Sequence, residues 1–546
     1  MLRKQITDNY SVSEQISLDD VDALAESGVT LIICNRPDGE EEGQLPFADV
    51  AAYAKEKNIK AEHIPFAGGQ MTAADVIAFQ AAIKDADNIH AYCRTGNRSS
   101  QIWQAAQEAS PADPSTQDNK ASSATADKAQ PKEDNKTTTQ YDVVVVGAGS
   151  AGISTAASLL KRKPGLKICL IDPAESHFYQ PGWTLVGGGV FKAANTRRNM
   201  ADVIPAHTKW LKEAVKTFLP NENKVVLENG QKIAYQYLVV AAGIKLNWDA
   251  IEGLSETLGR NGVTSNYRYD LAPYTWDLVK NLNGGKAVFT QPPMPIKCAG
   301  APQKAMYLSC DHWLKNDKLK DINVSFYNAG AVLFGVADYV PALESYIQKY
   351  QVNTHFTHNL VKVDGPNKRA YFATTDKDGE KSIVETEFDM LHVCPPQTAP
   401  DFIRNSPLVD AAGWVDVDKK TLQHTQFKNI WSLGDVSNTP NAKTMAAARK
   451  QAPVVAQNIA DAIDGNTIRA IYDGYGSCPL TVERGKIVLA EFGYGGKLLP
   501  TFPTWLNDGT KPTYLAWVLK EDLLPPFYWH GMLKGYEWFV KPTMRK

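Results

Sequence analysis

The stretch from residue 141 to residue 162, YDVVVVGAGSAGISTAASLLKR, decides the fold of most of this chain. Its four consecutive valines predict a buried parallel strand, and STAASLLKR predicts the helix that follows. The turn between them carries Gly147, Gly149 and Gly152, which let a pyrophosphate approach the free N–H groups at the helix N-terminus. A second predicted strand, LKICLID, ends at Asp172, where a carboxylate accepts from ribose hydroxyls. The segment therefore predicts a dinucleotide-binding unit of strand, helix and strand.

Two later segments pair a short apolar strand with a glycine turn. They are YLVVAAG, ending at Gly243, and IWSLGD, containing Gly434 and Asp435. In this order, after a glycine fingerprint, they resemble the later motifs of the flavoproteins with two dinucleotide-binding domains. The resemblance implies FAD, with Asp435 at the ribityl chain and a helix that begins near Lys443 and Thr444 directed at the flavin. No cysteine stands in HFYQP or AAG, so the flavin is predicted to be non-covalent.

The middle of this region lacks the second glycine fingerprint that binds NAD(P)H. The strand KAVFT (286–290) is followed by QPPMPIKCAG (291–300). Prolines lack the N–H groups that a pyrophosphate needs. We therefore predict a Rossmann-like half without its nucleotide, so the flavin must exchange electrons with another partner.

Seven cysteines are spread along the chain without a C-x-x-C pair. Cys298 stands beside Lys297 and just before the helix-like stretch APQKAMYLSCDHWLK, and both a helix N-terminus and an ammonium favour the thiolate. Cys478 follows in the turn-rich segment YDGYGSCPL. Each of these two alone is also compatible with a small buried apolar residue. The remaining cysteines of this region, Cys169, Cys310 and Cys394, are predicted to be core residues, and a third sulfur-handling role stays open for Cys394.

Four segments of this region closely resemble the mitochondrial-type sulfide:quinone oxidoreductases. They are SHFYQPGWTLVGGGV (176–190), PIKCAGAPQKAMYLS (295–309), AAGWVDVDKKTLQH (411–424) and DGYGSCPLTVERGKIVLAEF (473–492). The resemblance implies that Cys298 and Cys478 are a redox pair: hydrosulfide attacks the oxidised pair, leaves a persulfide on Cys478 and frees Cys298 as a thiolate that faces the flavin. It further implies that two electrons pass to quinone and the sulfane sulfur to an acceptor, for which glutathione, sulfite, sulfide and Cys93 remain open. The residues that it places along the FAD site are Ser150, Ala151, Gln180 and Val215.

The first part of the chain predicts a separate α/β domain. Strand and helix signals alternate through VTLIICN, FADVAAYAKEKN, AEHIPF, MTAADVIAFQAAIKDA and NIHAYC. The last strand leads into CRTGNRS, where Cys93, a small-residue loop and Arg98 form a cradle that binds an anion and stabilises a thiolate. The domain resembles a bacterial family of small phosphatase-like proteins, but the four residues between Cys93 and Arg98 match the spacing of rhodaneses. We expect persulfide transfer at Cys93, with phosphatase activity and an inert cysteine as alternatives; Arg36 and Asp38 are weaker candidates for the rim of the pocket.

Composition and the ends of these regions complete the prediction. A net charge of −2 gives no basic footprint for nucleic acid. Residues 109–139 lack aromatic residues and large apolar ones, so a flexible linker is expected between a sulfurtransferase domain at 1–108 and an oxidoreductase at 140–546. The last 46 residues hold ten aromatic residues, among them Trp505, Trp517, Trp529 and Trp538, which suits a lipid headgroup layer. With no signal peptide and no long apolar run, we expect a monotopic protein on the cytoplasmic side of the membrane, without a metal site; homo-oligomers stay open.

Two competing functions remain for the larger part. An NADH:quinone oxidoreductase of the same superfamily would need the second glycine fingerprint and would not need Cys298 or Cys478. A membrane-associated redox sensor would use the cysteine pair to report sulfide without steady-state quinone reduction.

Overall fold

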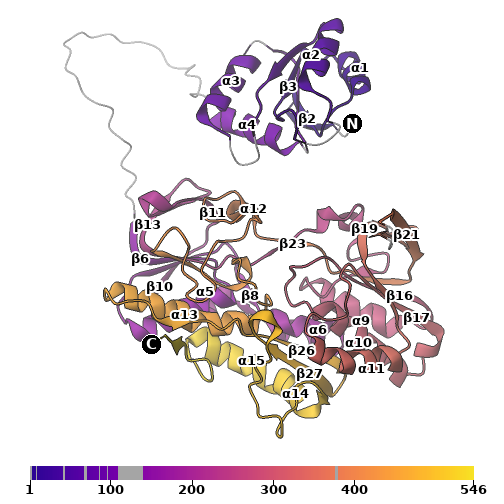
Figure 1. The fold of residues 1–546 in the computed structure, drawn as a ribbon, viewed down its shortest axis with the longest axis vertical. Helices are drawn as coiled ribbons and strands as arrows, with labels where there is room; N and C mark the ends of the chain where they lie inside the picture. Colours follow the sequence, from indigo (N-terminus) through magenta and orange to yellow (C-terminus); the bar gives the residue numbers. More distant parts are fainter. Residues whose placement is uncertain are drawn as a thin grey trace. The chain divides into compact units, whose positions relative to one another are not determined.

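The computed structural model describes residues 3–7, 9–40, 44–66, 71–84, 86–94, 96–108, 139–375 and 379–545. It forms two compact units, Met1–Pro131 and Lys132–Lys546 (Figure 1). Except for Thr139, the predicted linker lies outside the described residues. The two units are therefore described one at a time.

The first unit is a five-stranded sheet between two pairs of helices. Its strands are β1 (Lys4–Thr7), β2 (Tyr10–Ser13), β3 (Leu31–Cys34), β4 (Lys60–His63) and β5 (Ile89–Tyr92), in the order β1-β2-β5-β3-β4. Only β1 runs antiparallel to its neighbour. One face packs on α3 (Ala73–Ile83) and α4 (Asn97–Glu108), and the other on α1 (Leu18–Glu26) and α2 (Phe47–Glu56). Three of these strands and two of these helices fall where the alternating sequence pattern predicts them; β1, β2, α1 and α4 had no such signal.

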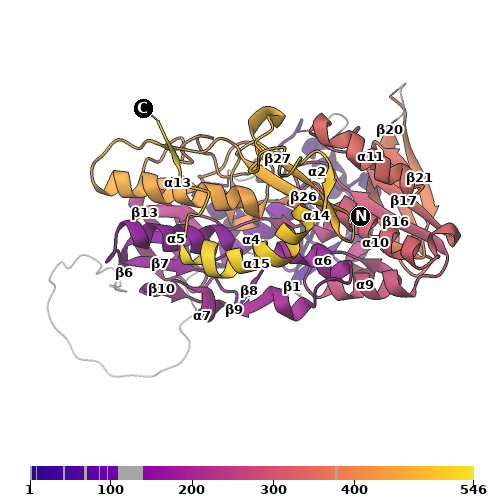
Figure 2. The same ribbon diagram turned by 90° about the horizontal axis from the view of Figure 1, so that it is seen from below.

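The second unit begins with the sheet that the opening segment nucleates. Its order is β10-β7-β6-β13-β12-β11, with β24 beside β13. The bounds are β6 (Thr139–Val146), β7 (Ile168–Ile171), β10 (Thr208–Leu211), β11 (Val215–Leu219), β12 (Lys224–Leu227), β13 (Lys232–Val240) and β24 (Ile430–Ser432). Alternate valines of β6 face two cores: Val143 and Val145 pack with α5 (Ser150–Arg162) and α13 (Met445–Ile463), while Val144 and Val146 pack on the opposite face. Helices α5 and α13 lie side by side across the first face, as both views show (Figures 1 and 2).

A second parallel sheet occupies the middle of this unit, as predicted for the half without a nucleotide fingerprint. Its order is β15-β22-β16-β17-β18. The bounds are β15 (Val263–Thr264), β16 (Gly285–Gln291), β17 (Ile322–Asn328), β18 (Asn353–Phe356) and β22 (Met390–His392). One face packs on α10 (Ala301–Lys315) and α11 (Val340–Lys349). The other packs on β19 (His358–Asp364) and β20 (Arg369–Thr375), which form an antiparallel sheet with the largely exposed β21 (Lys381–Glu387).

The C-terminal part adds a hairpin and a nearly continuous helical run. The hairpin is β26 (Gly476–Glu483) with β27 (Lys486–Phe492), and its inner face joins the core of α10. The run extends from α14 (Tyr514–Val518) through α15 (Leu524–Pro526) to residue 534, with π-helical turns between. Among the residues that the structure describes, no helix is long and apolar enough to cross a bilayer.

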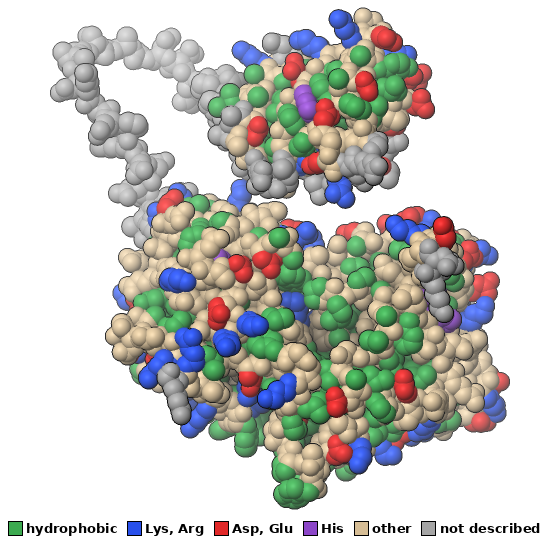
Figure 3. Space-filling view, in the orientation of Figure 1, with side chains coloured by type: hydrophobic (Ala, Val, Ile, Leu, Met, Phe, Trp, Pro, Cys, Tyr) green, Lys and Arg blue, Asp and Glu red, His purple; other side chains and the backbone are tan. Residues whose placement is uncertain are grey.

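The aromatic residues of this tail divide into two groups. Trp517 and Trp529 are buried, at 4% and 5% exposure, and Tyr528 and Leu533 belong to the core around α5. The exposed aromatic residues are Trp505, Tyr514, Tyr536, Trp538 and Phe539, and Leu506, Leu515 and Leu523 of the same tail are exposed as well. Figure 3 shows apolar side chains gathered at the lower edge of the second unit, near α14. The tail is thus partly a packing element, with Trp517 and Trp529 turned into the core and Trp505 and Trp538 exposed.

Candidate active site

The sulfur atoms of Cys298 and Cys478 come together in the second unit. Their Sγ atoms are 3.8 Å apart, although 180 residues separate them in the chain. Cys298 lies between β16 and α10 with a left-handed φ of 51°, and Cys478 lies in β26. Because β26 packs against α10, the hairpin brings the second cysteine to the first.

Two buried lysines give this pair an asymmetric charge environment. Lys304, one turn into α10, lies with its Nζ atom 3.1 Å from the Cys298 sulfur. Lys520, from the C-terminal helical run, is also buried; burial and then the charge of Lys304 hold its pKa well below the usual value, while its interaction with Cys298 favours a thiolate there. A hydrogen bond from Cys478 and then the ammonium of Lys304 hold the pKa of Cys298 well below its usual value. The same hydrogen bond and burial hold the pKa of Cys478 well above it. These opposite shifts favour the thiolate on Cys298 and the protonated thiol on Cys478.

Lys297 takes a different position from the one expected. Its Nζ atom donates to the side-chain oxygen of Gln180 and lies over the rings of Trp183 and Tyr267. Its charge is felt at Cys298, but the direct contact with the sulfur belongs to Lys304. The ammonium that contacts the Cys298 sulfur therefore comes from Lys304 in the first turn of α10 and not from the adjacent Lys297.

A backbone contact fixes the cysteine segment against the second flavin motif. The N–H of Cys298 donates to the carbonyl oxygen of Lys443 at 2.8 Å. The ammonium of Lys443 donates to the carbonyl oxygens of Asp435 and Ser437, at 2.8 Å each, and burial lowers its pKa to about 8. Thr444 caps α13 by accepting from Ala447 N–H at 3.1 Å. Cys298 is thus positioned by the residues assigned to the flavin.

The turn of Gly147, Gly149 and Gly152 forms a cradle that is closely packed at two of these glycines and has free space at Gly149. A Cβ at Gly152 would lie 1.9 Å from the carbonyl oxygen of Gly147, and one at Gly147 would lie 2.5 Å from that of Ala241, so these two glycines serve close packing. A Cβ at Gly149 would meet no atom within 4 Å, although Gly149 is the N-cap of α5. Unfilled space at a helix N-terminus fits the pyrophosphate of FAD.

Of the other predicted FAD residues, Asp172, Ala151 and Gly434 lie at this cradle, whereas Val215 does not. Asp172 accepts from the N–H groups of Ala148 and Ala174, at 2.7 and 2.9 Å, so its carboxylate braces the glycine turn. A Cβ at Gly434 would lie 3.2 Å from the Cβ of Ala151, which places the last motif beside the first. Gly243, with φ of 72°, follows β13 next to β6. Val215 begins β11 and is buried in the core on the far face of the sheet.

The C-terminal tail also reaches this cradle. The hydroxyl of Tyr528 lies 2.7 Å from that of Ser150, the first residue of α5, and bonds the ring of His177. Burial lowers the pKa of His177 to about 4, so its ring is neutral. The tail therefore completes the polar network at the N-terminus of α5.

The three remaining cysteines of this unit are buried. Cys169 and Cys310 lie in strand β7 and helix α10, each with no exposed surface. Cys394 belongs to the small core that Cys298 also touches, and Gln397 donates to its sulfur at 3.8 Å. Burial raises the pKa of Cys394 to about 12, which keeps it a thiol.

In the first unit, Cys93 and Arg98 flank the turn after β5. Cys93 and Arg98 are both buried, and Arg98, in the first turn of α4, donates to the carboxylate of Glu40 and to the carbonyl oxygen of Phe66. Burial lowers the pKa of Arg98, but the carboxylate of Glu40 and then the sulfur of Cys93 raise it by more. Arg36 lies beside the same carboxylate, whereas Asp38 accepts from the N–H of Phe47.

Sequence reasoning missed four residues of the two sites: Lys304, Lys520, Tyr528 and Glu40. Lys304 stood in the quoted PIKCAGAPQKAMYLS segment, where a lysine one turn into the helix was an available signal. The other three come from segments remote in sequence from the motifs they contact, and no local pattern marked them.

Each of the two units matches a known protein family. Residues 141–275 match the pyridine nucleotide-disulphide oxidoreductase family, and residues 2–110 match the phosphatase-like domain of the beta-lactamase hydrolase-like protein. The second unit, which brings Cys298 and Cys478 together, is an oxidoreductase of this flavoprotein class.

Within that class, the chain belongs to the sulfide:quinone oxidoreductase family. It is 43% identical over 417 residues to the mitochondrial sulfide:quinone oxidoreductase of Dictyostelium discoideum, covering 76% of this chain and 90% of that protein. The Mus musculus counterpart is 38% identical over 406 residues, covering 74% and 89%. The solved sulfide:quinone oxidoreductase of Aquifex aeolicus shares the fold, with a TM-score of 0.62 at 20% identity over 75% of this chain and 97% of that one. The predicted family and fold class are confirmed.

Proposed function

We propose that the second unit oxidises hydrosulfide through the Cys298/Cys478 pair, passes two electrons by way of FAD to a quinone, and hands sulfane sulfur to an acceptor. The observation that carries this proposal is the 3.8 Å approach of the two sulfurs, with Lys304 on one of them and the Lys443 backbone behind it. The catalytic residues are Cys298 and Cys478. FAD would be held by the cradle of Gly147, Gly149 and Gly152, by Asp172, and by the segments of Gln180, Gly243 and Asp435.

The asymmetry of the pair decides the direction of attack. In the disulfide form, HS⁻ attacks the Cys478 sulfur, the S–S bond breaks, and the products are Cys478–S–SH and Cys298–S⁻. The thiol of lower pKa is the better leaving group in such an exchange, and that thiol is Cys298. Lys304, whose ammonium lies 3.1 Å from the Cys298 sulfur, stabilises the charge that develops on it.

The second half of the cycle restores the disulfide. A thiolate or sulfite acceptor takes the outer sulfur of Cys478–S–SH, leaving a Cys478 thiolate that takes up a proton. Cys298–S⁻ and Cys478–SH then re-form their bond, releasing one proton and two electrons. FAD, when bound, accepts these two electrons and passes them to a quinone. The chain's own contribution is to align the two sulfurs, to hold the charge at Cys298 and to exclude water.

Anaerobic addition of sulfide to the purified protein tests this proposal. Flavin absorbance near 450 nm should bleach in the wild type and in Cys310→Ser, a buried cysteine on the same helix, but not in Cys298→Ser or Cys478→Ser. Bleaching by NADH rather than sulfide, or an unaffected Cys298→Ser variant, would overturn it. If sulfide bleaches the flavin but a soluble quinone is not reduced in the steady state, the protein is a redox sensor rather than a quinone reductase.

We further propose that the first unit transfers sulfane sulfur on Cys93, with Arg98 as the residue of its anion cradle. Its support is the position of the cysteine at a strand end and of Arg98 at the first turn of the next helix, where backbone N–H groups and a guanidinium favour a thiolate. Transfer from a persulfide donor should be measurable in the wild type and absent in Cys93→Ser. Hydrolysis of an aryl phosphate without any persulfide transfer would reverse the assignment to a phosphatase.

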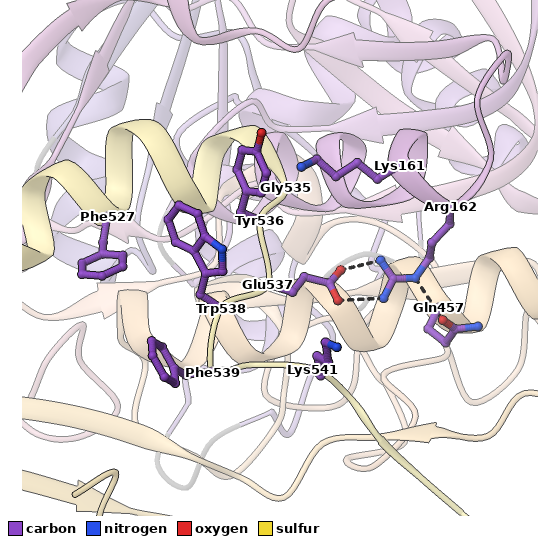
Figure 4. A pocket seen from close by; sticks show the side chains of 10 residues that line it. All are labelled: Lys161, Arg162, Gln457, Phe527, Gly535, Tyr536, Glu537, Trp538, Phe539 and Lys541. Atoms are coloured by element: carbon purple, nitrogen blue, oxygen red, sulfur yellow. Dashed lines mark hydrogen bonds and ion pairs between the residues drawn. The ribbon is translucent and has the colours of Figure 1, made fainter.

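We also propose that the exposed part of the C-terminal tail contacts a membrane surface, where a lipid-soluble quinone resides. An open groove of about 1110 Å³ lies between the tail and the end of α5 (Figure 4). Its lining combines the cations Lys161 and Lys541 with the aromatic residues Tyr536, Trp538 and Phe539. Phe539 and Trp505 are 82% and 84% exposed, which is unusual for such large apolar side chains outside an interface. Aromatic and lysine side chains together suit the headgroup layer.

A further inference from the structure

A buried ion-pair cluster in the first unit is left unexplained by the sulfur-transfer chemistry. Glu40, in the loop after β3, accepts two parallel hydrogen bonds from Arg98, at 2.7 Å each. Arg36 donates to the same carboxylate through Nε at 3.1 Å. The arginine side chains are 9% and 3% exposed, whereas that of Glu40 is 27% exposed. One carboxylate is thus held between two largely buried guanidinium groups, one of which belongs to the loop of Cys93.

This contact uses the donors that an external anion would need. The planar fork of a guanidinium binds a carboxylate or a phosphate through the same two N–H groups. In Arg98 both terminal nitrogens donate to Glu40, and Nη1 also donates to the carbonyl oxygen of Phe66 at 2.9 Å. A tetrahedral oxyanion at Arg98 would have to displace Glu40 and would meet the negative charge of its carboxylate.

We propose that Glu40 is a specificity-determining residue of the Cys93 site, which occupies the Arg98 fork, excludes doubly charged oxyanions and leaves the site to alkyl hydropersulfides. This inference rests on the proposed sulfur transfer for its substrate class. The accepted step is R–S–S⁻ + Cys93–S⁻ + H⁺ → R–S⁻ + Cys93–S–SH, in which the sulfane S–S bond of the donor breaks and a new one forms on Cys93. The disfavoured steps are transfer from thiosulfate, which releases sulfite, and attack on a phosphate monoester. Both of these bring a dianion to the fork that Glu40 fills.

Equilibrium binding tests the inference without turnover. Sulfate and thiosulfate are titrated by calorimetry into the full-length Cys93→Ser chain and into the Cys93→Ser/Glu40→Gln chain. Glutamine keeps the shape of glutamate and can still accept from Arg98, so the site should stay folded. We expect at least about tenfold tighter binding of both anions after Glu40→Gln, because one repulsive charge is removed and the fork becomes displaceable. The control is Glu26→Gln, an exposed carboxylate at the end of α1, which should leave both affinities unchanged.

Steady-state sulfur transfer is the second test of the role of Glu40. In the Cys93 background, Glu40→Gln should raise kcat/KM for thiosulfate by about tenfold or more, with no gain for glutathione persulfide. Affinities for sulfate and thiosulfate that stay within twofold of the Cys93→Ser chain would overturn the role of Glu40. Two other results together would separate the two proposals. If the Glu40→Gln chain binds the anions more tightly but the wild type transfers no persulfide, Glu40 still excludes oxyanions, whereas the proposed sulfur transfer is wrong. The titration of sulfate and thiosulfate is repeated with Glu40→Ala, which removes the carboxylate side chain altogether.

Discussion

The ammonium of Lys304 lies 3.1 Å from the sulfur of Cys298, six residues earlier in the chain. The two residues belong to a loop and to the helix that follows it, so the contact is local in sequence but depends on the left-handed backbone of Cys298 at φ of 51°. This turn directs the sulfur back over the first turn of α10, where the lysine stands.

Replacing Lys304 by methionine should slow flavin reduction by sulfide at pH 7 roughly 10- to 100-fold, because a hydrogen bond to a charged group contributes about 1.5–3 kcal/mol. The sign follows from the lowered pKa of Cys298: the thiolate persists to low pH in the wild type, and removing the ammonium raises the pKa, so activity should be regained as pH rises. The pH profile of anaerobic flavin reduction measures this. Lys315→Met, on the exposed side of the same helix, is the matched control; equal profiles for the two variants would contradict the prediction.

Gly149→Ala should lose FAD while keeping its fold. A Cβ at this position meets no protein atom within 4 Å and the backbone is not left-handed, so the cost falls on the pyrophosphate that would share the space. We expect at least about tenfold weaker FAD binding, measured by fluorescence during reconstitution of the apoprotein. Gly335→Ala, also with open space, is the control. Full flavin content in Gly149→Ala would show that the pyrophosphate of FAD does not bind at this glycine turn.

The first unit should lose stability in acid through His90. Its ring lies between the hydroxyls of Ser11 and Ser13, at 3.0 and 2.9 Å, and burial lowers its pKa to about 3 from 6.5. Below pH 6.5 the unfolded chain takes up a proton that the folded chain refuses, so the free energy of unfolding should fall by up to about 1.4 kcal/mol per pH unit until about pH 3. Above pH 6.5 the contribution of His90 is constant.

Hydrogen exchange of peptides from β2 and β5 measures this slope in the intact chain. His90→Gln should flatten it between pH 6.5 and 4. A variant with the wild-type slope would show that other groups carry the pH dependence.

Phe539→Ser and Trp505→Ser should each weaken binding to anionic phospholipid vesicles by about tenfold or more, since burial of a large apolar side chain contributes about 1.5–3 kcal/mol. Both side chains are exposed, so the folded state and its flavin should be retained. Vesicle sedimentation measures the change. Ile383→Ser, on the exposed strand β21, is a matched apolar control; an equal loss for this variant would argue against a specific surface. Point substitutions are preferable to deletion of residues 521–546, which would remove Tyr528 and Leu533 from the core.

The sequence predicted the parts of the fold that depend on local pattern. The valines of β6, the glycines of its turn and the strand before Asp172 carry their structure in their own spacing, because a parallel strand and a helix N-terminus have strong periodic signals. The strands β1 and β2 carry little such signal, because KQIT and YSVS mix polar and apolar residues and lack an apolar run such as LIIC of β3. The tail was read from its composition alone, which does not separate a buried tryptophan from one that faces lipid.

By itself, the sequence determined the class of the protein: a dinucleotide cradle, a second Rossmann-like half without a glycine turn, and two cysteines in family-specific segments. Only the tertiary structure decided which charges act on those cysteines. Lys520 and Tyr528 reach the sulfur and flavin sites from the C-terminal run, and Glu40 reaches Arg98 across the first unit. Motifs are read along the chain, whereas the electrostatic field at a buried thiol depends on whichever side chains the fold brings within a few ångströms, at any separation in sequence.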